Sequence, residues 1–394
     1  MNIRTLDELK EIEGKKILLR VDFNVPLTDT GEVQDDARIV ESLPTIKYLQ
    51  ENGSKLIIIT HLGRPDGEYK DEFRLTKIAE HLSELLGKPV KKTDTVLEGS
   101  VKETINEMTN GEIVMLENVR CRPEEEKCEL NFTAELASLG EIFVNDAFGT
   151  AHRKHASTWG LAEKLPSYAG FLMAKEIKEL SPLLTDEPKR PLTMIFGGAK
   201  IDTKIGIIKN FLDKADYFLI GGGLANTFLY AKGYDVGGSL YEKEKIDVAK
   251  EIMAACGEDK LFLPTDVVIA KEIEDVEVEN VKLQNISAEM KILDIGEETA
   301  EKYCEIIKKS GTVIWNGPLG LYEHKQFQKG SLAVATALSD ADCISIIGGG
   351  DTADCVKRFG IPVGKFTHVS TGGGACIEFL SGDKLPGIEA LIKK

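Results

Sequence analysis

The chain alternates between short apolar runs and longer stretches with helical periodicity. Each run is rich in Val, Ile and Leu, ends in a glycine or polar loop, and precedes apolar residues spaced along one helix face. This order is typical of buried parallel strands joined by crossover helices, so the pattern predicts an α/β fold. The predicted strands with their loops cover 16–26, 55–65, 112–123 and 141–153 in the first half, and 192–200, 217–226, 312–320, 343–352 and 366–374 in the second.

The loops that follow the strands differ between the two halves. Eight of the ten arginines precede residue 175, whereas adjacent glycines occur only after residue 196. Ligands of open α/β sheets bind beyond the carboxyl ends of the strands. Two sheets with such different loops predict two different ligands, which face one another across a cleft between two domains.

A cluster of three prolines within residues 181–192 indicates the domain boundary, after a predicted helix from Phe171 to Leu184. We therefore expect two doubly wound, Rossmann-like parallel-sheet domains over residues 1–171 and 186–380. An interdomain helix over 172–185 would join them. A hinge at this position could close the cleft.

Charge and composition narrow the range of partners. The chain of 394 residues has 49 Lys and Arg against 65 Asp and Glu, a net charge of −16, which argues against a nucleic-acid partner. The N-terminus lacks the apolar region of a secretory signal, and the longest apolar stretch, Tyr217 to Ala231, is too short to span a bilayer. The seven cysteines include no C-x-x-C pair. We expect a cytoplasmic monomer with reduced cysteines, no membrane segment and no nucleic-acid partner.

Four glycine loops of the second half are candidates for phosphate binding. They cover 197–204, 221–228, 348–355 and 370–377, each between a strand and a helix. The first amides of a helix lack intrahelical partners and lie at its positive end, so converging loops could surround a polyphosphate. Lys200 and Lys204, four residues apart at the start of a predicted helix, would share one face beside the glycines. Tight packing of strand on helix is the alternative for each glycine pair, and solvated lysines are the alternative for the two cations.

The same half carries candidate metal and ribose ligands. Asp351 and Thr352 follow a glycine triplet and fit the N-cap of a helix. The Asp351 carboxylate could also hold Mg²⁺ bridged to nucleotide phosphates, since Mg²⁺ usually takes one or two carboxylates. Glu323, seven residues after Asn316, could accept hydrogen bonds from ribose hydroxyls, with an ordinary surface acid as the alternative.

Polar and cationic residues follow the strands of the first half. Arginine pairs its planar fork with carboxylate or phosphate oxygens, so several arginines beside a histidine predict a site for a small, multiply anionic molecule. Surface ion pairs are the alternative for any single arginine. The residues expected to converge are Asp22, Asn24, Arg38, His61, Arg64, Arg120 and Arg153.

Nine motifs, taken in order, resemble the phosphoglycerate kinase family. They are RVDFNVP, HLGRP, ENVR, NDAFGTAHR, GGAK, GGGLANTF, WNGPLG, GGGDT and VSTGGGA. The resemblance implies reversible transfer of the acyl phosphate of 1,3-bisphosphoglycerate to MgADP, giving 3-phosphoglycerate and MgATP, a step of glycolysis and gluconeogenesis. It also implies that the N-terminal domain binds the phosphoglycerate and the C-terminal domain binds the nucleotide, with residues 381–394 packing back on the N-terminal domain.

The resemblance further implies roles for individual residues. The seven polar positions of the first half match the phosphoglycerate site. Glu323 would bind the ribose, Asp351 would bind the metal, and Arg38, Lys200 and Gly373 would act on the phosphoryl group in transfer. The positions that match the nucleotide site are Lys200, Lys204, Gly222, Asn316, Glu323, Gly349, Gly350, Asp351 and Thr352.

Phosphoryl transfer relies on positioning and charge stabilisation, so we expect direct in-line transfer after domain closure, with Mg²⁺ as cofactor and ATP or ADP as substrate. Asp202 and Thr203 depart from the common family wording, which leaves their role open. Cys376 stands where relatives have Ser, and it would be open to modification if its pKa were lowered. A non-catalytic two-domain protein that clamps an anion is the alternative, and so is a kinase for another small carboxylate.

Overall fold

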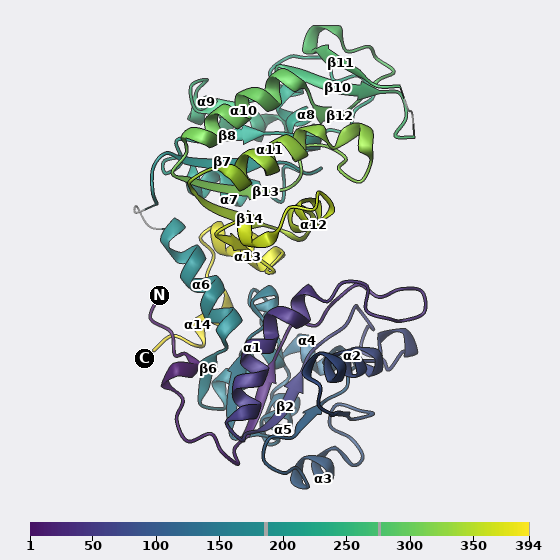
Figure 1. Ribbon diagram of the computed structural model, residues 1–394, viewed down its shortest axis with the longest axis vertical. Helices are drawn as coiled ribbons and strands as arrows, with labels where there is room; N and C mark the ends of the chain where they lie inside the picture. Colours follow the sequence, from purple (N-terminus) through teal and green to yellow (C-terminus); the bar gives the residue numbers. More distant parts are fainter. Residues whose placement is uncertain (185–187, 275–276, 394) are drawn as a thin grey trace. The chain divides into compact units, whose positions relative to one another are not determined.

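The chain forms two compact units (Figure 1). The computed structural model describes residues 1–184, 188–274 and 277–393. Unit 1 comprises Met1–Ser181 and Lys384–Lys394, and unit 2 comprises Pro182–Asp383. The predicted end of the interdomain helix at residue 185 and the predicted start of the second domain at residue 186 lie outside the described residues, as does residue 394.

Unit 1 is built on a six-stranded parallel sheet with the order β3-β4-β2-β1-β5-β6. The strands are β1 (Lys16–Arg20), β2 (Lys55–Ile59), β3 (Val90–Lys92), β4 (Ile113–Met115), β5 (Ile142–Asn145) and β6 (Ser167–Ala169). The helices are α1 (Ala37–Glu51), α2 (Thr76–Leu86), α3 (Val101–Asn106), α4 (Pro123–Lys127), α5 (Leu130–Ala137), α6 (Phe171–Leu184, which extends into unit 2) and α14 (Pro386–Glu389).

Alternate residues of each strand enter different cores, because successive side chains point to opposite sides of a sheet. Ile17 and Leu19 of β1 pack with residues of α1 and α2. Leu18, between them, packs with residues of α3 and α5. Helices therefore cover both faces of the sheet, which confirms the doubly wound arrangement.

The two ends of the chain meet in unit 1, where both termini are marked in Figure 1. Ile3 forms an antiparallel bridge with Ile392. The Arg4 amide donates to the Leu391 carbonyl at 3.0 Å. These contacts join the last residues of the chain to the first strand-like segment.

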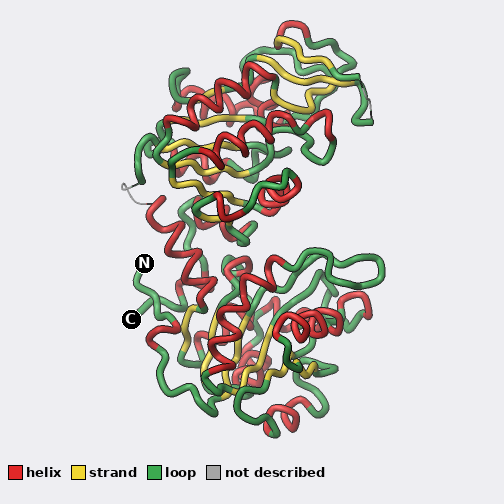
Figure 2. Tube along the Cα trace, in the orientation of Figure 1, coloured by secondary structure: helices red, strands yellow, loops and turns green. Residues whose placement is uncertain are grey.

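Unit 2 contains a second six-stranded parallel sheet, of order β15-β14-β13-β7-β8-β9, and a three-stranded antiparallel sheet, of order β11-β10-β12 (Figure 2). The parallel strands are β7 (Leu192–Phe196), β8 (Tyr217–Ile220), β9 (Leu261–Phe262), β13 (Thr312–Asn316), β14 (Ile344–Gly348) and β15 (His368–Val369). The antiparallel strands are β10 (Asp266–Ala270), β11 (Glu279–Lys282) and β12 (Lys291–Ile295). The helices are α7 (Ile205–Phe211), α8 (Gly222–Ala231), α9 (Ile246–Cys256), α10 (Glu297–Lys309), α11 (Lys329–Asp340), α12 (Gly350–Arg358) and α13 (Gly374–Leu380).

The predicted α/β class and all nine predicted strands are confirmed. The strands β3, β6 and β9 and the antiparallel sheet were not predicted. Strand β11 has an exposed or half-buried Glu-Asn-Val-Lys sequence with no apolar run, so its position depends on pairing with β10. All seven cysteines are free, as expected. Across the described residues, helices fall short of the length and apolarity that crossing a membrane requires.

Helix α6 is anchored to the end of β5 by a buried acid. The Asp146 carboxylate accepts a hydrogen bond from the Met173 amide at 3.1 Å, in the first turn of α6. Gly170 allows this approach, because a Cβ at that position would lie 2.2 Å from Asp146 Oδ1. Burial raises the pKa of Asp146 to about 6, although the hydrogen bonds from Met173 and its neighbours oppose the change.

We predict that Asp146 makes the protein less stable as the pH rises. A folded-state pKa near 6, above the ordinary value of about 3.9, means that deprotonation costs the folded state about 2 to 3 kcal/mol between roughly pH 4 and 7. Asp146→Asn keeps the acceptor oxygen and removes the charge. Chemical denaturation at each pH should show wild-type protein losing stability relative to this variant as the pH rises. The exposed Asp29→Asn variant should follow the wild type, and parallel curves for wild type and Asp146→Asn would contradict the prediction.

Candidate active site

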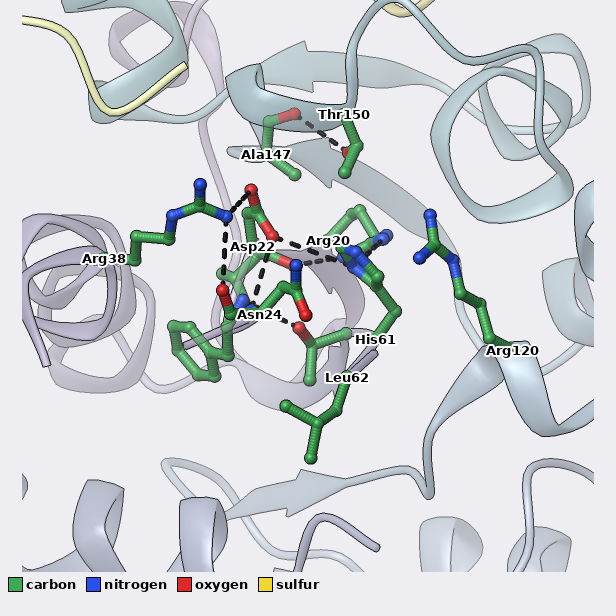
Figure 3. A network of polar contacts seen from close by, with 12 residues as sticks. Arg20, Asp22, Asn24, Arg38, His61, Leu62, Arg120, Ala147 and Thr150 are labelled. Carbon is green, nitrogen blue, oxygen red and sulfur yellow. Dashed lines mark hydrogen bonds and ion pairs between the residues drawn. The ribbon is translucent and has the colours of Figure 1, made fainter. Parts of the chain in front are cut away.

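Side chains at the carboxyl ends of β1 and β2 form one polar network in unit 1 (Figure 3). Asp22 accepts a hydrogen bond from Arg38 of α1, with 2.8 Å between Oδ2 and Nη1. The same Arg38 nitrogen also donates to the Asn24 carbonyl at 3.3 Å. The Asn24 side chain accepts from the Gly63 amide at 2.9 Å, which ties the loop after β1 to the loop after β2. The structure therefore brings together four predicted residues: Asp22, Asn24, Arg38 and His61, the last in the loop that Asn24 holds.

His61 is buried among cations. Its Nδ1 lies 3.0 Å from Nη2 of Arg20 and 3.7 Å from Oδ1 of Asp22. Burial lowers the pKa of His61 well below its ordinary value, and the charges of Arg20, Arg153 and Arg38 lower it further. The imidazole is therefore neutral at physiological pH.

The remaining arginines line a cavity of about 470 Å³ in the same unit. Its wall consists of Arg64, Pro65, Asp66, Arg120, Glu126, His152, Arg153 and His155. Arg120 donates to the Gly63 carbonyl at 2.8 Å and pairs with Glu126 at 3.2 Å, but its buried Nη2 has no hydrogen-bond partner among the described residues. Such a donor favours an anionic ligand, because an unsatisfied buried N–H group is energetically unfavourable.

Close backbone packing joins three loops of unit 2. A Cβ at Gly197 would lie 2.0 Å from the Pro318 carbonyl oxygen. Gly222 has a φ of +61°, and a Cβ there would lie 2.8 Å from the Gly198 nitrogen. The amide of Gly198 donates to the Pro318 carbonyl, and the amide of Gly222 donates to the Leu319 carbonyl, both at 2.8 Å. The packing alternative therefore holds for these glycines, and their amides are not free to bind phosphate.

Lys204 and Asn316 form the polar centre of unit 2. The Lys204 ammonium donates to Oδ1 of Asn316, whose amide nitrogen donates to the Gly348 carbonyl at 2.9 Å. Thr352 donates to the same carbonyl at 2.9 Å and accepts from the Gly317 amide at 2.7 Å. Burial lowers the pKa of Lys204 to about 8, although the charge of Asp351 opposes this change.

A cavity of about 710 Å³ lies in unit 2 between the glycine loops and the antiparallel sheet. Apolar walls come from residues such as Leu229, Val267 and Leu319, and its polar residues include Glu323, Asp351 and Asp294. Gly198, Gly222 and Gly223 line it as well. A mostly apolar cavity with a few acidic groups at its wall suits a nucleoside better than a bare anion.

Comparison with known proteins covers the whole chain. A family model described as phosphoglycerate kinase matches residues 6–383. A phosphoglycerate kinase of Clostridium perfringens is 49% identical, over 100% of this chain and 99% of the relative. One of Pelotomaculum thermopropionicum is 47% identical, over 98% of each chain. The solved phosphoglycerate kinase structure from Coxiella burnetii has a TM-score of 0.87 at 36% identity and covers 99% of this chain and 98% of that one.

The chain belongs to the phosphoglycerate kinase family. Phosphoglycerate kinase activity, in which a carboxyl group is the phosphoryl acceptor, follows from similarity over the full length of the chain. The alternative of a non-catalytic anion-binding protein is thereby set aside. Members of this family use MgATP and MgADP.

Three expectations for the phosphoglycerate kinase site are wrong. Lys200 and Lys204 do not share a helix face, because they flank a turn and α7 begins only at Ile205. The cause is the buried side chain of Ile201, whose carbonyl accepts from the Lys204 amide and closes the turn. Lys200 is consequently exposed, whereas Lys204 is only 8% exposed.

The other two corrections concern the N-cap of α12 and the thiol of Cys376. The N-cap of α12 is Gly349, with a φ of +93°, and not Asp351 or Thr352, which lie inside the helix. The positive φ of Gly349 lets the helix begin at Gly350, one residue before the acid. Cys376 is fully buried on the inner side of α13, so its thiol is not open to modification in the folded protein.

Six predicted residues line a cavity: Arg64, Arg120 and Arg153 in unit 1, and Gly222, Glu323 and Asp351 in unit 2. The other predicted residues, Lys200 and Gly373 among them, line neither cavity. Lys200 lies in the exposed turn after β7, and Gly373 is the N-cap of α13, after β15. Gly349 and Gly350 lie after β14, beside the Thr352 hydrogen bonds. All four follow carboxyl ends of strands in one sheet.

The structure also reveals polar residues that the sequence did not single out. Arg20, the last residue of β1, contacts His61 and donates to Ser157, whose hydroxyl donates in turn to Glu125. Asp294 lines the larger cavity, and burial raises its pKa to about 7. Asp202, whose role the sequence left open, forms a surface ion pair with Lys245 at 2.7 Å.

We predict that nucleotide binding weakens above about pH 8 because Lys204 loses its proton there. The dissociation constant of ADP, measured by calorimetry, should rise about tenfold per pH unit above the Lys204 pKa, until the bound-state pKa is reached. Lys204→Arg stays charged and should remove this rise. The exposed Lys209→Arg should keep it. An equal rise in Lys204→Arg would show that another group is responsible.

Proposed function

We propose that unit 1 binds the phosphoglycerate and that unit 2 binds the nucleotide. The observation that carries this proposal is the contrast between the cavities: three arginines and two histidines line one, and glycines and many apolar residues line the other. The first cavity suits a small molecule with several negative charges, and the second suits a nucleoside with attached phosphates.

In unit 1, the cationic cavity receives the phosphoglycerate. Arg64, Arg120 and Arg153, together with His61, orient it, and the unpartnered Nη2 of Arg120 gains an acceptor when an anion binds. Asp22 and Asn24 hold Arg38 by hydrogen bonds of 2.8 and 3.3 Å. Arg38 is thus positioned to contact the phosphoryl group in transfer.

In unit 2, Lys204 and Asn316 bind the nucleotide phosphates, assisted by the first amides of α12 at Gly350 and Asp351. Gly222 lines the cavity and leaves room for the nucleotide because it has no side chain. Its amide remains hydrogen-bonded to the Leu319 carbonyl. Glu323 accepts hydrogen bonds from the ribose. Thr352 and Gly349 set the start of α12.

Asp351 fits a role in holding Mg²⁺. It is exposed in the first turn of α12 and lines the nucleotide cavity. The described residues include no cluster of three or more His, Cys, Asp or Glu side chains suited to a metal ion. Mg²⁺ commonly takes a single carboxylate and completes its shell with phosphate and water, so one acid is sufficient. When bound, the ion would offset the negative charge of the phosphates.

The chemistry we propose is direct in-line transfer. The bond between the 1,3-bisphosphoglycerate carboxyl oxygen and phosphorus breaks while a bond from an ADP β-phosphate oxygen to phosphorus forms. The attacking ADP oxygen is already ionised, and the carboxyl oxygen leaves as a carboxylate, which is the ionised nucleophile of the reverse reaction, so neither direction needs a general base. Lys200, Arg38 and the Gly373 region stabilise charge on the phosphoryl oxygens. A hinge motion about α6 would exclude water during transfer.

We further propose that the protein acts as a cytoplasmic monomer. The family's place in glycolysis supports the location. Light scattering of the purified protein would test the oligomeric state, and a stable dimer would contradict it.

Arg38→Ala should lower kcat by some hundreds-fold, equivalent to about 3 to 4 kcal/mol, because it removes a charge that contacts the transferring group. A coupled assay of ATP formation from 1,3-bisphosphoglycerate measures this loss. Arg122→Ala is the matched control, since Arg122 pairs with Glu124 of the same unit at 2.9 Å. Near-normal kcat in Arg38→Ala would refute the proposed role of Arg38.

A further inference from the structure

Arg20 is a fully buried cation that the proposed mechanism does not use. It is 1% exposed at the end of β1, and it lies at the centre of the network in Figure 3. Its Nε donates to Ser157 Oγ at 2.9 Å, and its Nη2 lies 3.0 Å from His61 Nδ1. A third nitrogen, Nη1, donates to the Val21 carbonyl. The guanidinium is therefore held on three sides.

A buried acid provides the opposite charge. Glu125 of α4 is 1% exposed and accepts from Ser157 twice, from Oγ at 2.6 Å and from the amide at 3.0 Å. The Ser157 hydroxyl thus donates to Glu125 and accepts from Arg20. Burying a charge is costly unless it is paired and hydrogen-bonded, and this arrangement satisfies both conditions.

The contact with Arg20 determines which nitrogen of His61 carries the proton. A guanidinium has N–H donors and no acceptor, so His61 Nδ1 must accept. A neutral imidazole that accepts through Nδ1 carries its proton on Nε2. The charged and titratable groups that face the ring are Arg20, Asp22, Arg38, Arg153 and His155, and four of these five are basic.

We propose that Arg20, held by Ser157 and Glu125, is a positioning residue that locks His61 in the neutral Nε2–H tautomer. Resting on the proposed function, this assignment gives His61 one fixed task at the phosphoglycerate site: donating a hydrogen bond through Nε2 to an anionic oxygen of the substrate. The opposite tautomer would present a lone pair to that oxygen and repel it. We call the chain of contacts from Glu125 through Ser157 and Arg20 to His61 the relay. The relay therefore acts on substrate affinity and not on the transfer step itself.

The tautomer can be observed directly in the full-length protein. Long-range ¹H–¹⁵N correlation spectra of ¹⁵N-labelled protein distinguish protonated from unprotonated ring nitrogens, and a His61→Gln variant assigns the signals. We expect His61 to have a protonated Nε2 and an unprotonated Nδ1 at pH 7. This state should persist as the pH falls through the range in which ordinary histidines titrate. An imidazolium or an Nδ1–H ring at pH 7 would overturn the proposal.

Ser157→Ala removes the link between Arg20 and Glu125. Its His61 signals should become a mixture of tautomers, and KM for 3-phosphoglycerate should rise about tenfold with kcat changed less than twofold. Ser54→Ala is the control, because Ser54 is equally buried but donates only to the Leu49 carbonyl. A Ser157→Ala variant that folds and matches Ser54→Ala in both readouts would refute the relay. If Ser157→Ala does not fold, the wild-type spectrum alone decides.

The same spectra separate this inference from the proposed function. Adding 3-phosphoglycerate should shift the His61 Nε2 signal. If the free protein has the expected tautomer but the ligand shifts neither this signal nor the Arg120 side-chain signals, the relay stands and the assigned phosphoglycerate site is wrong.

Discussion

In a parallel sheet every strand ends at the same edge, and the loops that leave this edge must satisfy their own polar groups without a neighbouring strand. Both units of this protein meet that requirement with side chains and glycines that directly follow the strands. Asn24 accepts from the Gly63 amide in unit 1, and Thr352 accepts from the Gly317 amide in unit 2. The hydrogen bonds that complete the loops therefore also position the residues available to a ligand.

The two sheet edges differ in how they hold positive charge. Unit 1 uses guanidinium groups whose charge is offset by acids, as Arg38 is by Asp22 and Arg20 is by Glu125 through Ser157. Unit 2 uses one buried lysine with a neutral amide as its acceptor. The difference affects protonation, because arginine remains charged when buried, whereas burial lowers the Lys204 pKa to about 8. A ligand that brings negative charge would restore the lysine's proton.

The sequence was sufficient to predict the α/β class and the nine strands that have apolar runs, because such runs report burial directly. It also located Asp22, Asn24, His61 and Arg38. The first three follow strands directly, and Arg38 lies at the start of the helix that comes after β1. It could not find Arg20, because this arginine lies within a strand and its role depends on Ser157, which is 137 residues away. The lysine pair was misplaced because helical spacing does not reveal a turn closed by Ile201. The N-cap of α12 was misassigned because a glycine with positive φ can begin a helix without a side-chain cap.

We propose that two chemically unlike anion sites occupy separate units of one chain. A crystal structure of the protein with 3-phosphoglycerate and MgADP tests it most directly. We expect 3-phosphoglycerate in contact with Arg64, Arg120 and Arg153 of unit 1, and the ADP phosphates beside Lys204 and the start of α12 in unit 2. Electron density for both ligands in the same unit, or for the nucleotide phosphates on the arginines, would contradict it.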